Sequence, residues 1–334
     1  MKKLMIIALG AAVALTSCLK NNYEDISAPE EISFKSFNLG ENTRADFTHD
    51  YFRAYAQFSN KGDGSDYKDF WGAAAKKIVK KNDGSADYWA AEDGTYYWPK
   101  AGAISFWGYY YPEDQTSVNL SLDTNVGIKG TDVTAAQAAL IMLAKPEESR
   151  LKTANTVKML FRHVGSQVVF RFANASIDNN FALTINKVEI TEAMNKGNFT
   201  YADWSDYEEE TTYQSTQSYA VNNKEIGTDN AYTFSTLPQA LAESGAKKYI
   251  NVYYRVADNN AGYEYEGVYT AEATDWKINT IHYYNITIDF TKGGEIQNRK
   301  HFAEHMLAGL HGFDGKRSMF IGVVCQNHCI HIMF

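Results

Sequence analysis

The residues best suited to metal chemistry lie near the end of the chain. His301-Phe302-Ala303-Glu304-His305 matches the H-x-x-E-H pattern, in which two histidines on one helical face bind zinc and the glutamate acts as a base. That class of peptidase also needs a carboxylate ligand further along the chain, and Asp314 is the only acid after Glu304. Other residues that could bind a metal adventitiously are His311, Cys325, His328, Cys329 and His331. We therefore predict neither a zinc peptidase nor a metal site, and we expect a tail without regular structure.

Two further patterns carry weaker chemical signals. Asp63, Ser65 and Asp66 offer oxygen ligands, but their loop lacks the alternating acids and the closing glutamate of a calcium loop, so we predict a plain turn. His163 has no obvious cysteine or serine partner, and we expect it to be structural. The chain also contains no nucleophile elbow, phosphate loop or dinucleotide fingerprint. The sequence therefore predicts no enzyme and no cofactor.

An aromatic run, Phe106–Tyr111, leaves two interpretations open. Its rings could form a platform that binds carbohydrate, or they could be core residues and cross-strand pairs of a β-sheet. We favour the second interpretation and keep the first as the basis of an alternative function.

The first eighteen residues have the layout of an export signal. Two lysines precede an apolar stretch, Leu4–Leu15, that is too short to span a bilayer, and small residues follow it. The sequence Leu15-Thr16-Ser17-Cys18 resembles the bacterial lipobox, in which cleavage precedes a cysteine that then receives lipid. We predict that residues 1–17 are removed and that Cys18 is lipidated; the alternative is an ordinary signal with a coincidental cysteine.

The remaining composition favours β structure and excludes nucleic acid as a partner. The chain has 32 basic and 40 acidic residues and no basic stripe that could neutralise phosphates. Its 23 tyrosines and 18 phenylalanines suit pleated, half-buried surfaces, and it has only five prolines. Many short segments of alternating polarity, separated by turn residues, predict an all-β fold of sandwiches.

Several segments show the expected period of two. In the clearest, Phe52, Ala54, Ala56 and Phe58 alternate with more polar neighbours, which predicts one buried face. Residues 258–262 predict a hairpin turn, and Tyr284, Ile286, Ile288 and Phe290 share a face of the last strand. Only residues 134–143 and 239–244 could form short helices.

Changes in composition suggest domain limits. We predict a tether and first strand over 18–44, β-sandwiches over 45–176 and 177–292, and an atypical tail over 293–334. Five of the eight histidines and two of the three cysteines lie in that tail. The tail therefore either does not belong to the preceding domain or derives from an altered reading frame.

The chain resembles the fimbrillin family, the lipoprotein-derived pilins of anaerobic Gram-negative bacteria. The matching segments run in the family's order and span roughly residues 1–292. They are the lipobox, Ile32–Phe37 with Thr43-Arg44-Ala45, Tyr97-Trp98-Pro99, Ile104–Tyr110, Leu160–Val168, Gly197–Thr200, Leu237-Pro238-Gln239 and Tyr283–Ile288.

The resemblance implies two transthyretin-like β-sandwich domains in tandem. It also implies that a protease cuts after an arginine, and that loss of the first strand opens a groove which a strand of another subunit fills. In this chain Arg44-Ala45 is the matching cut site, and Ile32, Phe34 and Phe37 are candidates for the strand that leaves. An ordinary solvated loop arginine is the alternative for Arg44. The family's donor strand should follow residues 283–290, where this chain has its histidine-rich tail; within it, only Met319–Val324 is strand-like.

Together these observations predict a structural subunit of a surface fimbria, exported as an outer-membrane lipoprotein. Its expected partners are other fimbrial subunits, the membrane through lipid on Cys18, and a surface receptor. The alternative is a permanently lipid-anchored adhesin or glycan-binding protein that does not polymerise.

Overall fold

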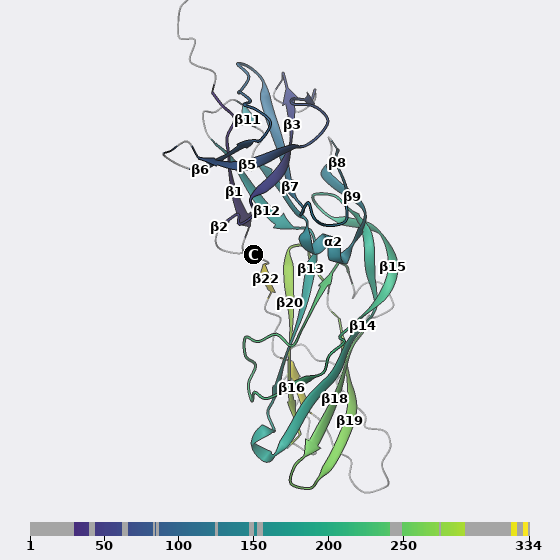
Figure 1. Ribbon diagram of the computed structural model, residues 1–334. Helices are drawn as coiled ribbons and strands as arrows, with labels where there is room; N and C mark the ends of the chain where they lie inside the picture. Colours follow the sequence, from purple (N-terminus) through teal and green to yellow (C-terminus); the bar gives the residue numbers. More distant parts are fainter. Residues whose placement is uncertain are drawn as a thin grey trace, which may run out of the picture.

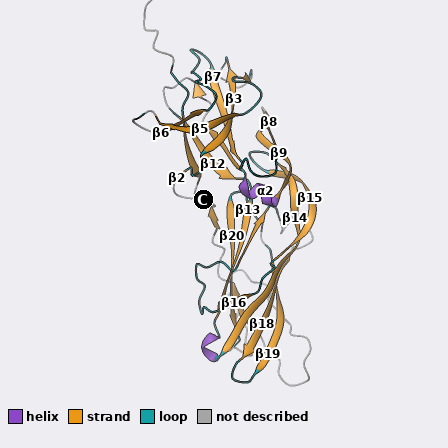
Figure 2. Ribbon diagram, viewed as in Figure 1, coloured by secondary structure: helices purple, strands orange, loops and turns teal. Residues whose placement is uncertain are grey.

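The computed structural model consists almost entirely of β-strands (Figures 1 and 2). It describes residues 30–39, 44–61, 66–82, 84, 87–123, 126–146, 150–151, 156–240, 249–273, 275–290, 322–325 and 330–332. The only helices among these residues are α2 (Ala135–Leu140) and a 3-10 turn, η1 (Ile177–Asn179). The predicted all-β fold is confirmed, and the division into two tandem sandwich domains stays a prediction.

The N-terminal strands form a sheet that closes on itself, and this closed sheet is called the ring below. Around it the order is β7-β10-β12-β1-β6-β5-β3, and β3 pairs with β7 to complete the circle. The short strands β2, β4 and β11 flank it. The bounds are β1 (Phe34–Leu39), β2 (Arg44–Asp46), β3 (Tyr51–Ser59), β4 (Lys68–Asp69), β5 (Lys76–Asn82), β6 (Asp87–Ala91), β7 (Ala103–Tyr110), β10 (Met142–Pro146), β11 (Arg150–Leu151) and β12 (Val157–His163).

Two further sheets, called the lower sheets, lie mostly below the ring in Figure 1, and strands β8 and β9 of one of them reach up beside it. One has the order β17-β13-β20, and β21 and β22 pair with the outer edge of β20. The other has the order β19-β18-β14-β9-β8, and β15 and β16 pair with β14. The bounds are β8 (Asn119–Asp123), β9 (Gly127–Thr134), β13 (Ser166–Asn174), β14 (Phe181–Phe199), β15 (Trp204–Gln214), β16 (Tyr219–Val221), β17 (Tyr232–Thr236), β18 (Tyr249–Asp258), β19 (Tyr263–Glu272), β20 (Thr280–Asp289), β21 (Gly322–Cys325) and β22 (Ile330–Ile332).

The pairing crosses the predicted domain limit at residues 176–177. Strand β13 precedes that limit but pairs with β17 and β20, and β9 also precedes it but pairs with β14. The exact domain bounds therefore stay a prediction.

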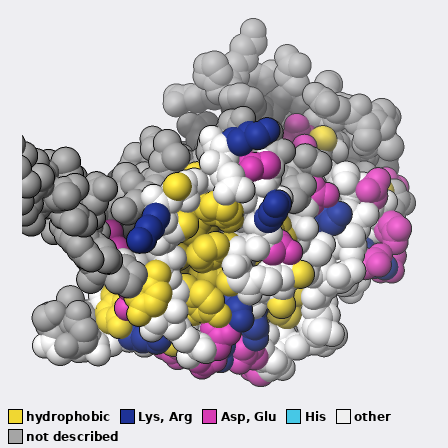
Figure 3. Space-filling model, turned by 90° about the horizontal axis from the view of Figure 1, so that it is seen from above, with side chains coloured by type: hydrophobic (Ala, Val, Ile, Leu, Met, Phe, Trp, Pro, Cys, Tyr) yellow, Lys and Arg dark blue, Asp and Glu magenta, His cyan; other side chains and the backbone are white. Residues whose placement is uncertain are grey.

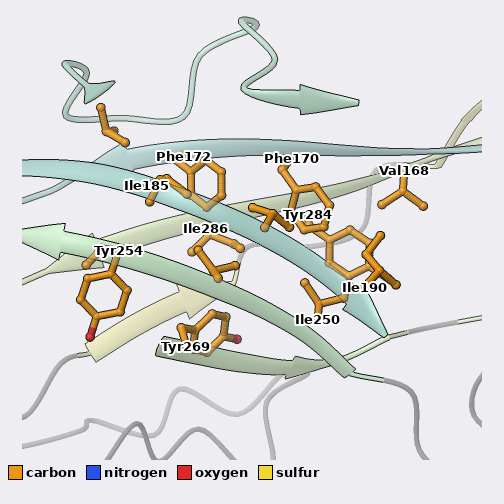
Figure 4. Packing of buried hydrophobic residues seen from close by; sticks show 14 of the residues in the cluster. Val168, Phe170, Phe172, Ile185, Ile190, Ile250, Tyr254, Tyr269, Tyr284 and Ile286 are labelled. Carbon is orange, nitrogen blue, oxygen red and sulfur yellow. The ribbon is translucent and has the colours of Figure 1, made fainter. Parts of the chain in front are cut away.

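Separate hydrophobic clusters stabilise these sheets. The ring encloses a core rich in aromatic residues, and the two lower sheets enclose a second core in which Phe170, Tyr284 and Ile286 face Ile185 and Ile250 (Figure 4). The alternation of Tyr284, Ile286, Ile288 and Phe290 is confirmed, since all four are buried.

A third cluster joins the ring to the lower sheets. It combines Tyr55 of β3, residues of α2, and Phe199 and Trp204 of the β14–β15 hairpin. The linker between β12 and β13 is held there because Trp204 donates its indole N–H to the Val164 carbonyl at 2.8 Å and Gly165 donates to the Ala138 carbonyl at 3.1 Å. The ring and the lower sheets thus pack against each other at this cluster.

Strand β3 shows where alternation alone is incomplete. Phe52, Ala54 and Ala56 are buried in the ring core as predicted, and Phe58 is partly buried. Tyr55 and Gln57 on the opposite face are buried as well. Tyr55 belongs to the third cluster, so this strand is covered on both sides.

The predicted helices are shorter than expected. Helix α2 begins after Thr134, whose side chain accepts from the backbone N–H of Gln137 in a capping box, and it ends at Leu140 rather than at residue 143. The second predicted helix begins at Gln239, which instead forms an isolated β-bridge with Trp276; residues 241–248 lie outside the described residues. The turn over 258–262 is confirmed as the link between β18 and β19.

The expectation of a tail without regular structure is wrong for its described residues. Strand β21 forms four antiparallel pairs with β20, and β22 forms three. The physical reason is that an edge strand such as β20 has backbone groups that a further strand can pair with. The tail supplies residues that favour strands, namely Val323, Val324, Ile330 and Ile332.

Deletion of residues 322–334 is expected to lower the melting temperature by less than about 4 °C, because the ordering entropy of two short strands offsets most of their hydrogen-bond gain. Differential scanning calorimetry of full-length and shortened protein checks this. A loss of ten degrees or more would mean that the tail is an integral part of the lower sheets.

No helix among the described residues is long and apolar enough to cross a membrane.

Candidate functional site

The candidate site is the first strand of the ring and the groove that this strand fills. Strand β1 runs parallel to β12 and forms five successive pairs with it, from Phe34–Val157 to Asn38–Phe161. On its other side only one pair, Phe34–Trp89, joins β1 to β6, and the C-terminal half of β1 pairs instead with β2. The ring is therefore joined weakly at the seam between β1 and β6.

The N-terminal half of β1 is anchored by large apolar side chains. Phe34 is 1% exposed, and its ring centroid lies 5.1 Å from that of Phe106, 5.8 Å from Phe52 and 6.5 Å from Trp71. Ile32 is also buried, and its backbone N–H donates to the Tyr96 carbonyl at 2.8 Å. These two predicted residues therefore lie in the core of the ring.

The C-terminal half of β1 differs in character. Ser36 and Asn38 continue the inward face of Phe34 and are buried, and the Ser36 hydroxyl has no hydrogen-bond partner among the residues that the structure describes. Phe37 lies on the opposite face and is only partly buried, with the Lys35 ammonium 5.5 Å from its ring centroid. All three candidate residues therefore belong to this segment, but Phe37 faces away from Phe34, since residues an odd number apart on a strand face opposite sides.

Arg44 and Ala45 belong to a strand rather than to a loop. The backbone of Arg44 pairs with Leu39 and that of Ala45 with Asn38. Within the described part of the chain β2 pairs only with β1. The pairing agrees with a cut site and with an ordinary surface arginine alike, so both interpretations stay open.

The other candidates are placed as follows. Asp66 accepts hydrogen bonds from the Ser59 hydroxyl at 2.5 Å and the Asn60 N–H at 3.2 Å, as in a turn, whereas Asp63 and Ser65 lie outside the described residues. No group of residues in the described ranges could hold a metal ion. Cys18, His301, Glu304 and His305 also lie outside those ranges.

The aromatic run Phe106–Tyr111 is divided between two environments. Phe106 is buried in the ring core, and Trp107 packs against Tyr201 with ring centroids 5.5 Å apart. Tyr109 and Tyr111 line a surface groove next to the ion pair of Arg53 and Glu113. Figure 3 shows that hydrophobic side chains gather on the face seen from above, bordered by charged ones. The carbohydrate platform stays a prediction.

His163 is a structural residue at the third cluster. Its Nδ1 atom lies 3.1 Å from the Ala139 carbonyl oxygen, and its backbone N–H donates to the Asn279 side chain at 2.9 Å. Burial is the main cause that lowers the pKa of His163 below its ordinary value, and the nearby His49 lowers that pKa further.

Stability is expected to fall as the pH drops below about 6.5, because the unfolded chain then binds a proton at His163 that the folded protein resists. The contribution is fully present above that pH. Urea unfolding of the wild type and of His163→Gln at pH 7.5 and 5.5 measures it. The variant should lose less stability between the two pH values; an equal loss would exclude His163 as a source.

The fold and the comparisons agree on the class of protein. Residues 43–298 match the fimbrillin-like family, and the chain belongs to that family. The members of that family are structural proteins rather than enzymes. No curated protein sequence matches the chain.

Solved structures of low identity are similar to this chain. A candidate cell adhesion protein from Bacteroides eggerthii has a TM-score of 0.45 at 12% identity, covering 91% of this chain and 95% of its own. The fimbrial anchor protein Mfa2 from Porphyromonas gingivalis has a TM-score of 0.30 at 11% identity, with 79% and 92% covered. The tip fimbrial protein Mfa3 from the same organism has a TM-score of 0.34 at 11% identity, with 85% and 94% covered.

Proposed function

We propose that this protein is a structural subunit of a surface fimbria, that it is exported as a lipoprotein through Cys18, and that it assembles by strand exchange after a cut between Arg44 and Ala45. The observation that carries the proposal is the position of β1, a strand inside a closed ring that directly precedes the cut site.

The geometry favours release of β1 after such a cut. Before the cut, β1 is covalently linked through residues 40–43 to β2 and the rest of the ring. After the cut the segment is held by the five pairs with β12, the single pair with β6 and the short pairing with β2. The bridge between Glu31 and Tyr97, with its backbone hydrogen bonds, and the buried side chains also hold it, but no covalent link to the ring remains. The unpartnered Ser36 hydroxyl weakens that hold further.

The vacated groove would bind another strand strongly. Loss of β1 leaves one edge of β12 without a partner and exposes the pocket of Phe34, lined by Phe52, Trp71 and Phe106. Burying one phenylalanine there contributes about 1.5–3 kcal/mol, and backbone pairing along β12 adds to it. An incoming strand from another subunit therefore restores what the cut removes.

Limited digestion of mature-length protein (residues 18–334) with an arginine-specific protease tests the proposal. We expect a monomer before digestion, and heat-sensitive oligomers afterwards that lack residues 18–44. The matched control is Arg44→Gln, which removes this site and retains Arg53 and the other arginines; it should stay monomeric. A digested protein that loses residues 18–44 and stays monomeric, without capturing an added peptide of residues 30–39, would exclude strand exchange. That result would favour the permanently anchored adhesin.

The lipid anchor is tested separately. Cys18→Ala should abolish acyl labelling and reduce the amount of protein at the cell surface, because cleavage and lipid attachment both need that cysteine. The matched control is Cys325→Ala, which should change neither. Normal acylation of the Cys18→Ala variant would contradict the lipoprotein assignment.

A further inference from the structure

The two halves of the groove that β1 fills accept side chains of different size. The inference drawn from this rests on the proposed function of strand exchange. We infer that Phe47 forms the floor of the C-terminal half, and that it restricts any replacement strand to small or polar side chains at the positions of Ser36 and Asn38.

The position of Phe47 follows from its ring contacts. Its ring stacks on Phe161 of β12 with centroids 4.4 Å apart, and it meets Trp89 of β6 at 5.8 Å. Strands β12 and β6 are the two neighbours of β1 in the ring. The Phe47 centroid also lies 6.1 Å from that of Phe52 and 6.0 Å from that of Tyr110, so Phe47 lies inside the ring, with its closest ring contact on β12 beside β1. Phe47 is 7% exposed and belongs to the ring core.

The register places this ring under one half of β1. Phe161 is the cross-strand partner of Asn38, and Met159 is the partner of Ser36. Phe161 and Met159 are fully buried, so they face inward beside these two residues. Phe47 therefore fills the space that larger side chains at positions 36 and 38 would need.

The other half of the groove is a deep socket. Phe34 reaches Phe52, Phe106 and Trp71, and Ile32 continues the same face. The pattern over residues 32–38 is thus large apolar at 32 and 34, then small or polar at 36 and 38. Since buried space is packed close to its limit, added methylene groups in the shallow half force neighbours to move.

Phe47 is retained when β1 leaves. Phe47 lies after Arg44 in the chain, so a cut between Arg44 and Ala45 releases β1 and leaves Phe47 in the ring. The partner that fits is therefore an extended segment, parallel to β12, with two large apolar residues followed by two small or polar ones at alternate positions. This pattern would select the register of the incoming strand, because a shift of two residues puts a large side chain on Phe47 and a shift of one turns the apolar residues outward.

Peptide exchange tests the inference. Mature-length protein with a sequence-specific protease site within residues 40–43 is cut, the released segment is removed in mild urea, and labelled peptides of residues 30–39 are added. The native peptide should bind, and a Ser36→Leu peptide should bind at least about tenfold more weakly. The matched control is a Lys35→Leu peptide, because Lys35 is exposed; its affinity should change less than about threefold.

A variant of the protein tests the role of Phe47 separately. In Phe47→Ala the penalty for the Ser36→Leu peptide should shrink to less than about threefold, since the leucine then has room. A Ser36→Leu peptide that binds the unaltered protein as well as the native peptide does would overturn the inference and leave strand exchange intact. A failure of every peptide to bind after release of β1 would overturn the proposed function itself. The comparison of peptides on the unaltered protein holds even where Phe47→Ala folds poorly.

Discussion

Phe34→Ala is expected to lower the free energy of unfolding of the ring by about 3–5 kcal/mol. The side chain is 1% exposed and contacts Phe52, Phe106 and Trp71, so its removal leaves a cavity in the centre of the aromatic core. Because β1 has a single pair with β6, the buried side chain of Phe34 contributes much of the contact at this seam. Urea unfolding followed by tryptophan fluorescence reports on the ring, whose core includes Trp71 and Trp89.

The control for this prediction is Lys35→Ala on the same strand. Lys35 is exposed, and its contact with the ring of Phe37 is worth at most about 1 kcal/mol. Similar losses for both variants would mean that β1 is not anchored by the Phe34 socket, and the proposed acceptor groove would lose its main source of binding energy.

Gly127→Ala is the second change with a large expected effect, a loss of roughly 2–5 kcal/mol. Gly127 begins β9 with φ of +83°, a backbone conformation that a side chain disfavours. In addition, a Cβ atom at this position would overlap the ring of Trp107, which packs there and against Tyr201. The change should therefore weaken the contact between the ring and the lower sheets. Thermal unfolding measures the loss.

Gly72→Ala separates the backbone cost of a positive φ from the cost of overlap with a neighbouring side chain. Gly72 has φ of +99°, but no atom of the described residues lies within 4 Å of a Cβ atom built there. It should therefore show only the backbone cost, about 1–2 kcal/mol. Equal losses at both positions would mean that Trp107 moves aside freely and that this contact does not stabilise the molecule.

The local sequence pattern predicted where the strands lie better than it predicted which strands pair with each other. Alternation identified the buried residues of β3 and β20, because one face of each strand must enter a core. It could not show that β3 pairs with β7 to close a ring, or that β13 joins the lower sheets, since both depend on contacts between distant segments. For the same reason Tyr55 and Gln57 were expected on an exposed face and are buried.

The candidate site was predicted in part. The apolar residues Ile32, Phe34 and Phe37 indicated the strand, but counting apolar residues could not show that Phe37 lies on the opposite face from Phe34. Phe47 was missed because its short segment shows no periodicity. Its position three residues after Arg44 was the available signal, since a large apolar side chain directly after a polar stretch needs a place in the core.

The most direct test of strand exchange is the N-terminal residue of the protein in fibres sheared from the cell surface. The proposed cut predicts Ala45 as the first residue, with no peptide from residues 30–39 in the fibre. A subunit in such fibres that begins at a lipidated Cys18 and retains β1 would contradict the account.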